Sequence, residues 1–202
     1  LVNPVGGSKI AIAEALLNIV WTPLTHGLKG VSLSANWMWP AKNEGENARL
    51  YSAVEAVSEF CIELGINVPT GKDSLSMTQK YPDGEVVYSP GTVIISATAE
   101  CSDIRKSISP AIQAGKDSSL ILIPFTTGSP QLGGSSLAQV LNLLGDEVPA
   151  VVDGKTFARG FGAVQDLINA GYVLSGHDVS SGGLITTLLE MCFPVPDVGL
   201  TI

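Results

Sequence analysis

Two side chains that carry oxygen atoms, Glu14 and Asn18, stand four residues apart in a segment whose apolar spacing predicts a helix. Residues four apart lie on one face of a helix, so the carboxylate and the carboxamide would point to the same side. Hard oxygen atoms of this kind are the ligands that Mg²⁺ prefers in proteins. On this pair alone, an alternative stays open in which both side chains only face solvent or hydrogen-bond along the helix.

A second group of polar residues lies in Gly176-His-Asp-Val-Ser-Ser-Gly-Gly183, between a predicted strand and a predicted helix. Glycines allow close backbone approach, and the start of the helix offers free N–H groups and a positive dipole to a phosphate. Asp178 could hold a metal ion that bridges this phosphate, and Ser180 could donate a hydrogen bond to it. The alternative is a turn in which Asp178 or Ser180 caps the helix. We expect His177 to be a structural hydrogen-bonding residue, because no serine or cysteine nucleophile accompanies it.

The segment Gly71-Lys-Asp-Ser74 invites comparison with a phosphate-binding P-loop, and the comparison fails. Five residues separate Gly65 from Gly71 where the pattern requires four, and Asp73 stands where Ser or Thr should hold the metal. Lys72 could still approach a phosphate as a point charge, or pair with Asp73. We predict no catalytic residue in this chain.

The composition bounds the function. The chain has 202 residues, 45% of them hydrophobic and 15% charged, which is typical of a globular protein able to bury a core. Its net charge of -8 removes the electrostatic basis for non-specific nucleic-acid binding. No apolar run reaches the roughly 18 residues of a membrane span. Three cysteines without metal-ligand spacing favour the reducing cytoplasm: Cys61, Cys101 and Cys192.

The elements that must position these residues form an α+β arrangement in the N-terminal half. Ser8 is the predicted cap of a helix that ends at Ile19, and Gly65 is the predicted stop of a helix over 46–64. The segment 71–74 is predicted as a loop, and Pro82-Asp-Gly84 as a turn. Strands are predicted at 30–35, 86–88 and 92–99.

A more polar stretch separates this half from an α/β C-terminal half. We predict a first domain over 1–102, a linker over 103–116 and a second domain over 117–202. In the second domain, strands at 119–124 and 172–175 alternate with helices at 133–144, 157–170 and 184–192. The chain begins at Leu1 without a methionine and stops within a predicted strand opening over 198–202. We therefore expect it to be a piece of a longer polypeptide.

Several motifs in a fixed order carry a family resemblance. They are Ala13-Glu-Ala-Leu-Leu-Asn18, Leu33-Ser-Ala-Asn-Trp-Met38, Gly71-Lys-Asp-Ser-Leu-Ser-Met77 and Gly176-His-Asp-Val-Ser-Ser-Gly-Gly-Leu184. The series resembles the large, single-chain form of phosphoribosylformylglycinamidine synthase, over essentially the whole chain. The matching region is the second of two modules similar to aminoimidazole ribonucleotide synthetase. Another ATP-dependent synthetase of the same superfamily is the alternative, against which the segments at 34–38 and 72–77 argue.

The resemblance implies a fold and a reaction. The family's N-terminal α+β half pairs with a counterpart in a β-barrel, and an α/β half follows it. The parent enzyme activates the formyl amide oxygen of formylglycinamide ribonucleotide with ATP. Ammonia, released from glutamine in a separate domain, then displaces phosphate to give the amidine, and Mg²⁺ neutralises phosphate charge. The implied partners are ATP or ADP, the first synthetase module and the glutaminase domain.

The resemblance also assigns site residues. It implies that Glu14, Asn18 and Asp178 are magnesium ligands and that Ser180 contacts the nucleotide. A further acidic ligand is expected upstream of Leu1. In the large enzymes the nucleotide of this module resembles a retained structural ADP, so the chain would be a non-catalytic scaffold. We expect the isolated chain to lack synthetase activity, to bind nucleotide weakly, and to self-associate through apolar surface left by missing partners.

Overall fold

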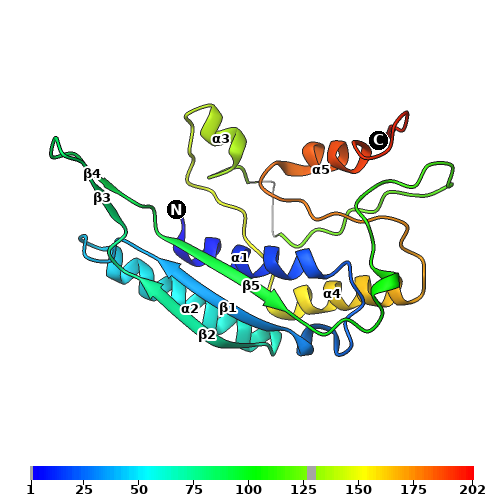
Figure 1. Cartoon of the computed structure of the whole chain (residues 1–202), viewed down its shortest axis with the longest axis horizontal. Coiled ribbons are helices and arrows are strands. Elements are labelled where there is room, and N and C mark those ends of the chain that lie inside the picture. Colours follow the sequence, from blue (N-terminus) through cyan, green and yellow to red (C-terminus); the bar gives the residue numbers. More distant parts are fainter. Residues whose placement is uncertain (1, 127–130) are drawn as a thin grey trace.

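The computed structural model describes residues 2–126 and 131–202. A sheet with helices packed against one of its faces forms the body of the molecule, and further segments lie beyond the helices (Figure 1). The helices are α1 (Pro4–Ile19), α2 (Glu46–Leu64), α3 (Ser136–Val140), α4 (Gly154–Asn169) and α5 (Gly183–Cys192). The strands are β1 (Ser32–Met38), β2 (Asn67–Ser74), β3 (Thr78–Lys80), β4 (Val86–Tyr88) and β5 (Thr92–Thr98).

The central strand of the main sheet is β1, which pairs in parallel with β2 and antiparallel with β5. Its side chains alternate between two environments, as the pleat of a strand requires. Leu33, Ala35 and Trp37 are buried among the helices, whereas Ser34 and Asn36 lie on the opposite, open face. Strands β3 and β4 form a separate hairpin that projects from the body (Figure 1).

Long-range pairing corrects one prediction in this half. The segment 71–74, predicted as a loop, is the second half of β2, where Gly71 pairs with Ala35 and Lys72 with Asn36. Glycine, lysine and aspartate have low strand propensity, but a neighbouring strand that supplies hydrogen-bond partners overrides a weak local preference. The strands predicted at 30–35, 86–88 and 92–99 are confirmed as β1, β4 and β5, with small shifts at their ends.

The first helix begins earlier than the sequence suggested. Asn3 caps it by accepting a hydrogen bond from the Gly6 N–H at 2.9 Å, and Pro4 occupies the first turn. Ser8, predicted as the cap, is instead a buried helical residue whose hydroxyl donates to the Pro4 carbonyl at 2.6 Å. The predicted helix over 46–64 is confirmed as α2, which ends at Gly65 with φ of 69°.

One hydrophobic core joins the two halves of the chain. Phe157 and Phe161 of α4 are fully buried in the same cluster as Leu16 of α1 and Phe60 of α2. The Phe60 and Phe157 rings meet edge to face, with centroids 6.0 Å apart. Helix α4 belongs to the C-terminal half in sequence, yet it completes the core of the N-terminal half.

The C-terminal half forms helices where they were predicted, although α3 has only 5 residues within the predicted 133–144, and it does not form its predicted strands. Within the described residues, 119–124 and 172–175 have no strand partner, and a single bridge joins Thr126 to Val151. Ile121 is 75% exposed, although its run of apolar residues predicted a buried strand. An extended apolar segment becomes a strand only beside another strand that satisfies its N–H and C=O groups. None of the helices described is both long and apolar enough to cross a membrane.

Candidate functional site

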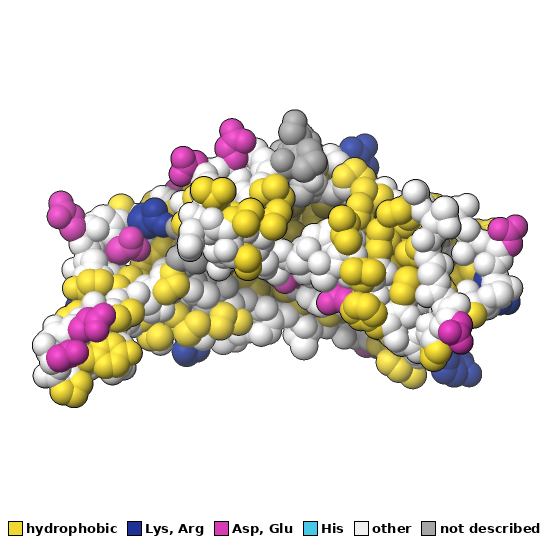
Figure 2. Space-filling model, turned by 90° about the horizontal axis from the view of Figure 1, so that it is seen from above, with side chains coloured by type: hydrophobic (Ala, Val, Ile, Leu, Met, Phe, Trp, Pro, Cys, Tyr) yellow, Lys and Arg dark blue, Asp and Glu magenta, His cyan; other side chains and the backbone are white. Residues whose placement is uncertain are grey.

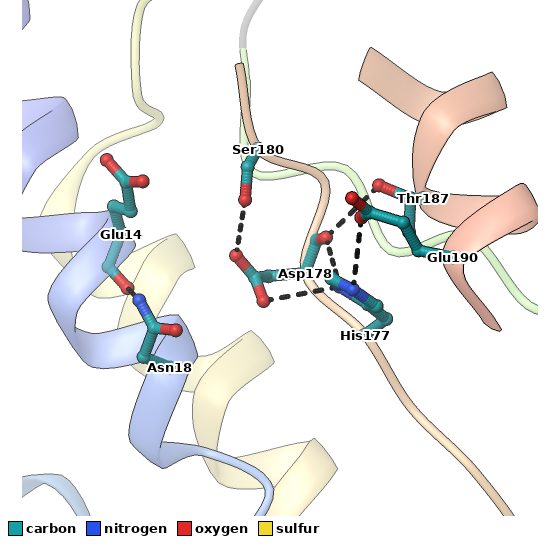
Figure 3. Close-up of polar contacts among 7 residues, drawn as sticks. All are labelled: Glu14, Asn18, His177, Asp178, Ser180, Thr187 and Glu190. Atoms are coloured by element: carbon teal, nitrogen blue, oxygen red, sulfur yellow. Dashed lines mark hydrogen bonds and ion pairs between the residues drawn. The ribbon is translucent and has the colours of Figure 1, made fainter. Parts of the chain in front are cut away.

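The predicted ligand pair on α1 shares one exposed face of the helix. The Asn18 amide donates to the backbone carbonyl of Glu14 at 3.0 Å (Figure 3). No described residue hydrogen-bonds to the Asn18 amide oxygen or to the Glu14 carboxylate. The shared helix face that the spacing predicted is therefore present, and these three oxygen atoms have no hydrogen-bond partner among the described residues.

Residues 176–183, called here the Asp178 segment, hold a tight polar cluster (Figure 3). The Ser180 hydroxyl donates to Asp178 Oδ2 at 2.9 Å, and Asp178 Oδ1 lies 3.5 Å from His177 Nδ1. The Asp178 side chain is only 12% exposed. The Asp178 carboxylate is therefore held in one orientation by residues of its own segment.

His177 acts as a structural hydrogen-bonding residue, in agreement with the prediction. Its Nδ1 lies 2.8 Å from the Asp178 carbonyl, and its Nε2 lies 3.4 Å from Oε2 of Glu190 on α5. Thr187 of α5 donates to the same Asp178 carbonyl at 3.3 Å. These contacts tie the Asp178 segment to the middle and the last turn of α5.

The helix start that follows carries no side-chain cap. Gly182 is the N-cap residue of α5, and neither the Asp178 side chain nor the Ser180 side chain accepts a hydrogen bond from an α5 N–H. The Gly183 N–H donates to the Ser180 carbonyl at 2.9 Å, with Gly183 in the left-handed region at φ of 81°. The side chains of Asp178 and Ser180 therefore do not cap the helix, as the alternative had proposed. First-turn N–H groups of α5 remain available to an anion.

The Asp178 segment lies beside α1, so the two groups of predicted ligands come from neighbouring elements (Figures 1 and 3). The backbone of Gly176 rests against the ring of Trp21, just after the end of α1. In Figure 3 the Asp178 carboxylate is directed toward the helix that carries Glu14 and Asn18.

The donor set suits magnesium better than a transition metal. Among the residues described, no three His, Cys, Asp or Glu side chains gather in a way that could hold a metal ion. The predicted ligands would offer two carboxylates and one amide oxygen, and Mg²⁺ characteristically completes a partial oxygen shell with water and substrate phosphates. Carboxylate and amide oxygens are thus the donor types that a Mg²⁺ ion bound with a nucleotide would use.

Lys72 is not brought to this site. Its ammonium group donates to Asn36 Oδ1 at 3.2 Å on the open face of the sheet. Helix α1 packs on the opposite face, against Ala35 and its neighbours. The strand pleat places Lys72 away from Asp178, because residue 72 lies within β2 and not in a loop.

Sequence reasoning missed residues that support the site. Thr187 and Glu190 stand three apart on α5 and so share the helix face that meets His177, a spacing that could have indicated them. Trp21 had no such signal, since its contact with Gly176 joins distant parts of the chain.

Two family models match the chain. The one described as "FGAR-AT PurM_N-like domain" matches residues 1–100, and the one described as "AIR synthase related protein, C-terminal domain" matches residues 124–200. These matches place the chain among AIR-synthase-related proteins, and they confirm the predicted class, a PurM N-like α+β half followed by an AIR-synthase-like C-terminal half.

Curated relatives define the family more closely. The chain is 44% identical over 194 residues to the probable phosphoribosylformylglycinamidine synthase, chloroplastic/mitochondrial, of Arabidopsis thaliana. It is 41% identical over 204 residues to the probable phosphoribosylformylglycinamidine synthase of Caenorhabditis elegans. The alignments cover 96% of this chain but only 14% and 15% of those proteins. The chain belongs to the phosphoribosylformylglycinamidine synthase family and corresponds to a part of the large enzyme.

Solved structures share the fold. T. maritima PurL complexed with AMPPCP matches 95% of this chain with a TM-score of 0.54 at 11% identity, over 27% of its own length. T. maritima PurL complexed with FGAR gives the same TM-score at 12% identity, over 94% of this chain and 29% of its own. At such low identity the match establishes the arrangement of elements and nothing about individual residues.

Proposed function

We propose that this chain contributes a Mg²⁺–nucleotide site to a carbon–nitrogen ligase that converts formylglycinamide ribonucleotide to formylglycinamidine ribonucleotide with ATP and glutamine. The observation that carries the proposal is the position of the Asp178 segment beside the α1 face with Glu14 and Asn18. The names of the relatives support the reaction, and the titles of the PurL complexes with AMPPCP and ATP support the nucleotide.

Each residue has a distinct part in this proposal. Glu14, Asn18 and Asp178 would hold Mg²⁺, which when bound neutralises phosphate charge. The first-turn N–H groups of α5 would receive a phosphate oxygen. Ser180 would turn its hydroxyl from Asp178 Oδ2 to the nucleotide, and the ion would take its place at the carboxylate. Lys72 takes no part, because it lies on the other face of the sheet.

A second candidate function is that of a non-catalytic scaffold, which would retain ADP as a structural ligand. The histidine of the site is already engaged with Asp178 and Glu190, and the proposal assigns the carboxylates of Glu14 and Asp178 to the metal ion, so it assigns no residue of the site as general acid or base. Loss of bound ADP and a lower melting temperature in an Asp178→Ala full-length protein, with turnover kept, would favour the scaffold. Loss of turnover with the fold intact would favour catalysis.

The remaining parts of the proposal concern the whole protein. We propose domains over 1–102 and 117–202 joined by 103–116, with α4 of the second domain packed into the core of the first. The parent would also hold the first synthetase module and a glutaminase domain. We propose a cytoplasmic location, which imaging of the tagged full-length protein tests. The isolated chain should self-associate through its exposed apolar residues, and a monomer by light scattering at high concentration would contradict this.

Calorimetric titration with ADP, with and without MgCl₂, tests the proposed site. It is run on the full-length protein and on the 202-residue chain, with Asp178→Ala and with Asp166→Ala as control. Asp166 is an exposed residue of α4, so both variants lose the same charge. We expect Asp178→Ala to weaken magnesium-dependent binding at least about tenfold, with the control unchanged. Equal affinities in both variants would contradict the proposal.

A further inference from the structure

Trp21 stands at the end of α1 without a polar anchor for its ring. The indole N–H is buried, and no described residue accepts a hydrogen bond from it. A buried indole N–H usually finds a partner, so packing alone determines where this ring lies. The ring is partly buried at the edge of the hydrophobic core.

The ring of Trp21 lies directly on the backbone of Gly176. Gly176 is buried, and a methyl group built on it would overlap the six-membered part of the indole. The φ of Gly176 is not in the left-handed region, so the backbone conformation itself would accept alanine. Position 176, two residues before Asp178, therefore requires glycine because the Trp21 ring occupies the space that a side chain would need.

Two backbone hydrogen bonds hold the same junction. The Ile108 N–H donates to the Trp21 carbonyl at 2.8 Å, and the Gly176 N–H donates to the Ser109 carbonyl at 3.2 Å. Residues 108 and 109 thus bridge the end of α1 and the Asp178 segment. This part of the stretch predicted as a linker is a spacer with a fixed conformation.

The side of the junction that follows α1 is anchored in the core by Gln165 of α4. Its Nε2 donates to the Val20 carbonyl at 2.6 Å and to the Thr22 carbonyl at 3.0 Å, and its Oε1 accepts from the Leu24 N–H at 2.8 Å. Gln165 is only 5% exposed. The backbone on both sides of Trp21 is therefore fixed, and the ring is a rigid support for Gly176.

We propose that Trp21 is a positioning residue that sets the separation between the α1 ligand face and the Asp178 carboxylate. The proposal rests on the proposed nucleotide site. Supports behind metal ligands set ligand orientation, and their loss typically weakens metal binding about 10–100-fold. Trp21 touches neither metal nor nucleotide and acts through Gly176.

Paired substitutions separate positioning from general packing. Gly176→Ala pushes the Asp178 segment off the ring, and we expect Mg²⁺-dependent ADP affinity of the full-length protein to fall about tenfold. Trp21→Leu in the same protein makes room for the methyl group and should restore most of that affinity. Gly162→Ala is the matched control, because Gly162 has open space where its Cβ would be. The affinity for ADP without Mg²⁺ should change little in any of these variants.

Hydrogen exchange of residues 176–182, measured on the 202-residue chain without nucleotide, gives a second readout. We expect faster exchange in Gly176→Ala and a return toward the original rate in the double variant. Unchanged exchange and affinity in Gly176→Ala would overturn the proposal while leaving the proposed function intact. The proposal would also be overturned if adding Trp21→Leu to Gly176→Ala restored neither the exchange rate nor the ADP affinity. Absence of Mg²⁺-dependent binding in the unsubstituted protein would refute the proposed function, and exchange alone would then decide whether Trp21 positions the segment.

Discussion

The two regions of this molecule differ sharply in how they bury apolar residues. In the region built from α1, α2, α4 and the main sheet, Phe157 and Phe161 are fully buried. In the outer region with α3, α5 and the segments around them, Val140 is 81% exposed and Phe193 is 73% exposed. Figure 2 views the face that carries α3 and α5, where hydrophobic side chains gather in patches. The first region holds the hydrophobic core, and the second leaves many of its apolar side chains exposed.

The candidate site lies where these two regions meet. Glu14 and Asn18 belong to a helix of the packed region, and the Asp178 segment leads into α5 of the outer region. A ligand bound across this boundary would couple the less stable region to the more stable one. The predictions below test the contrast between the regions, from the largest expected effect to the smallest.

Removing a core aromatic ring should produce the largest effect. Phe157→Ala takes away a fully buried ring that contacts Phe60 and Phe125, so we expect the free energy of unfolding to fall by about 3–5 kcal/mol. Phe193→Ala in the outer region should change it by less than about 0.5 kcal/mol. Urea denaturation followed by circular dichroism measures both. Similar losses in the two variants would remove the distinction between the regions.

Removing the buried amide of Gln165 should produce the next largest effect. Gln165→Leu leaves the carbonyls of Val20 and Thr22 and the N–H of Leu24 without their partner. Because an unsatisfied buried polar group costs about 1–3 kcal/mol, the free energy of unfolding should fall by about 3 kcal/mol. Gln139→Leu, at an exposed residue of α3, is the control. A change below 1 kcal/mol in Gln165→Leu would show that Gln165 does not anchor the segment after α1.

The buried thiol of the packed region should produce the smallest effect. Burial raises the pKa of Cys61 to about 11 from an ordinary value of 9.0. Between these values the unfolded chain loses the proton and the folded chain keeps it, so the free energy of unfolding falls as pH rises from about 9 to about 11.

Denaturation at pH 8 and pH 10 measures this dependence, and Cys61→Ala should reduce it where Cys192→Ala does not. Cys192 is partly exposed in the outer region and should also react with Ellman's reagent before Cys61. A faster reaction at Cys61 would place an opening motion in the region described here as packed.

Sequence reasoning succeeded where local chemistry decides the structure. The bounds of α2 follow from its apolar spacing and from Gly65, and the β3–β4 turn follows from Pro82 to Gly84. The shared face of Glu14 and Asn18 follows from helical periodicity alone.

Sequence reasoning failed where contacts between residues far apart in the chain determine the structure. The extension of β2 through Lys72 depends on pairing with β1, and the extended run around Ile121 lacks a strand beside it among the described residues. The contact of Trp21 with Gly176 and the place of α4 in the core of the other half are long-range as well. No local sequence pattern predicts these contacts, because they form only when the elements pack together.

Paramagnetic broadening of the amide signals of the ¹⁵N-labelled chain by Mn²⁺ and ADP tests the central claim most directly. Mn²⁺ replaces Mg²⁺ at oxygen ligands and broadens nearby signals even when binding is weak. We predict that residues 14–18 and 176–183 broaden together, and that the signals of Lys72 and of the β3–β4 hairpin do not. Broadening centred on Lys72 and the open face of the sheet, or broadening of only one of the two predicted segments, would contradict the account.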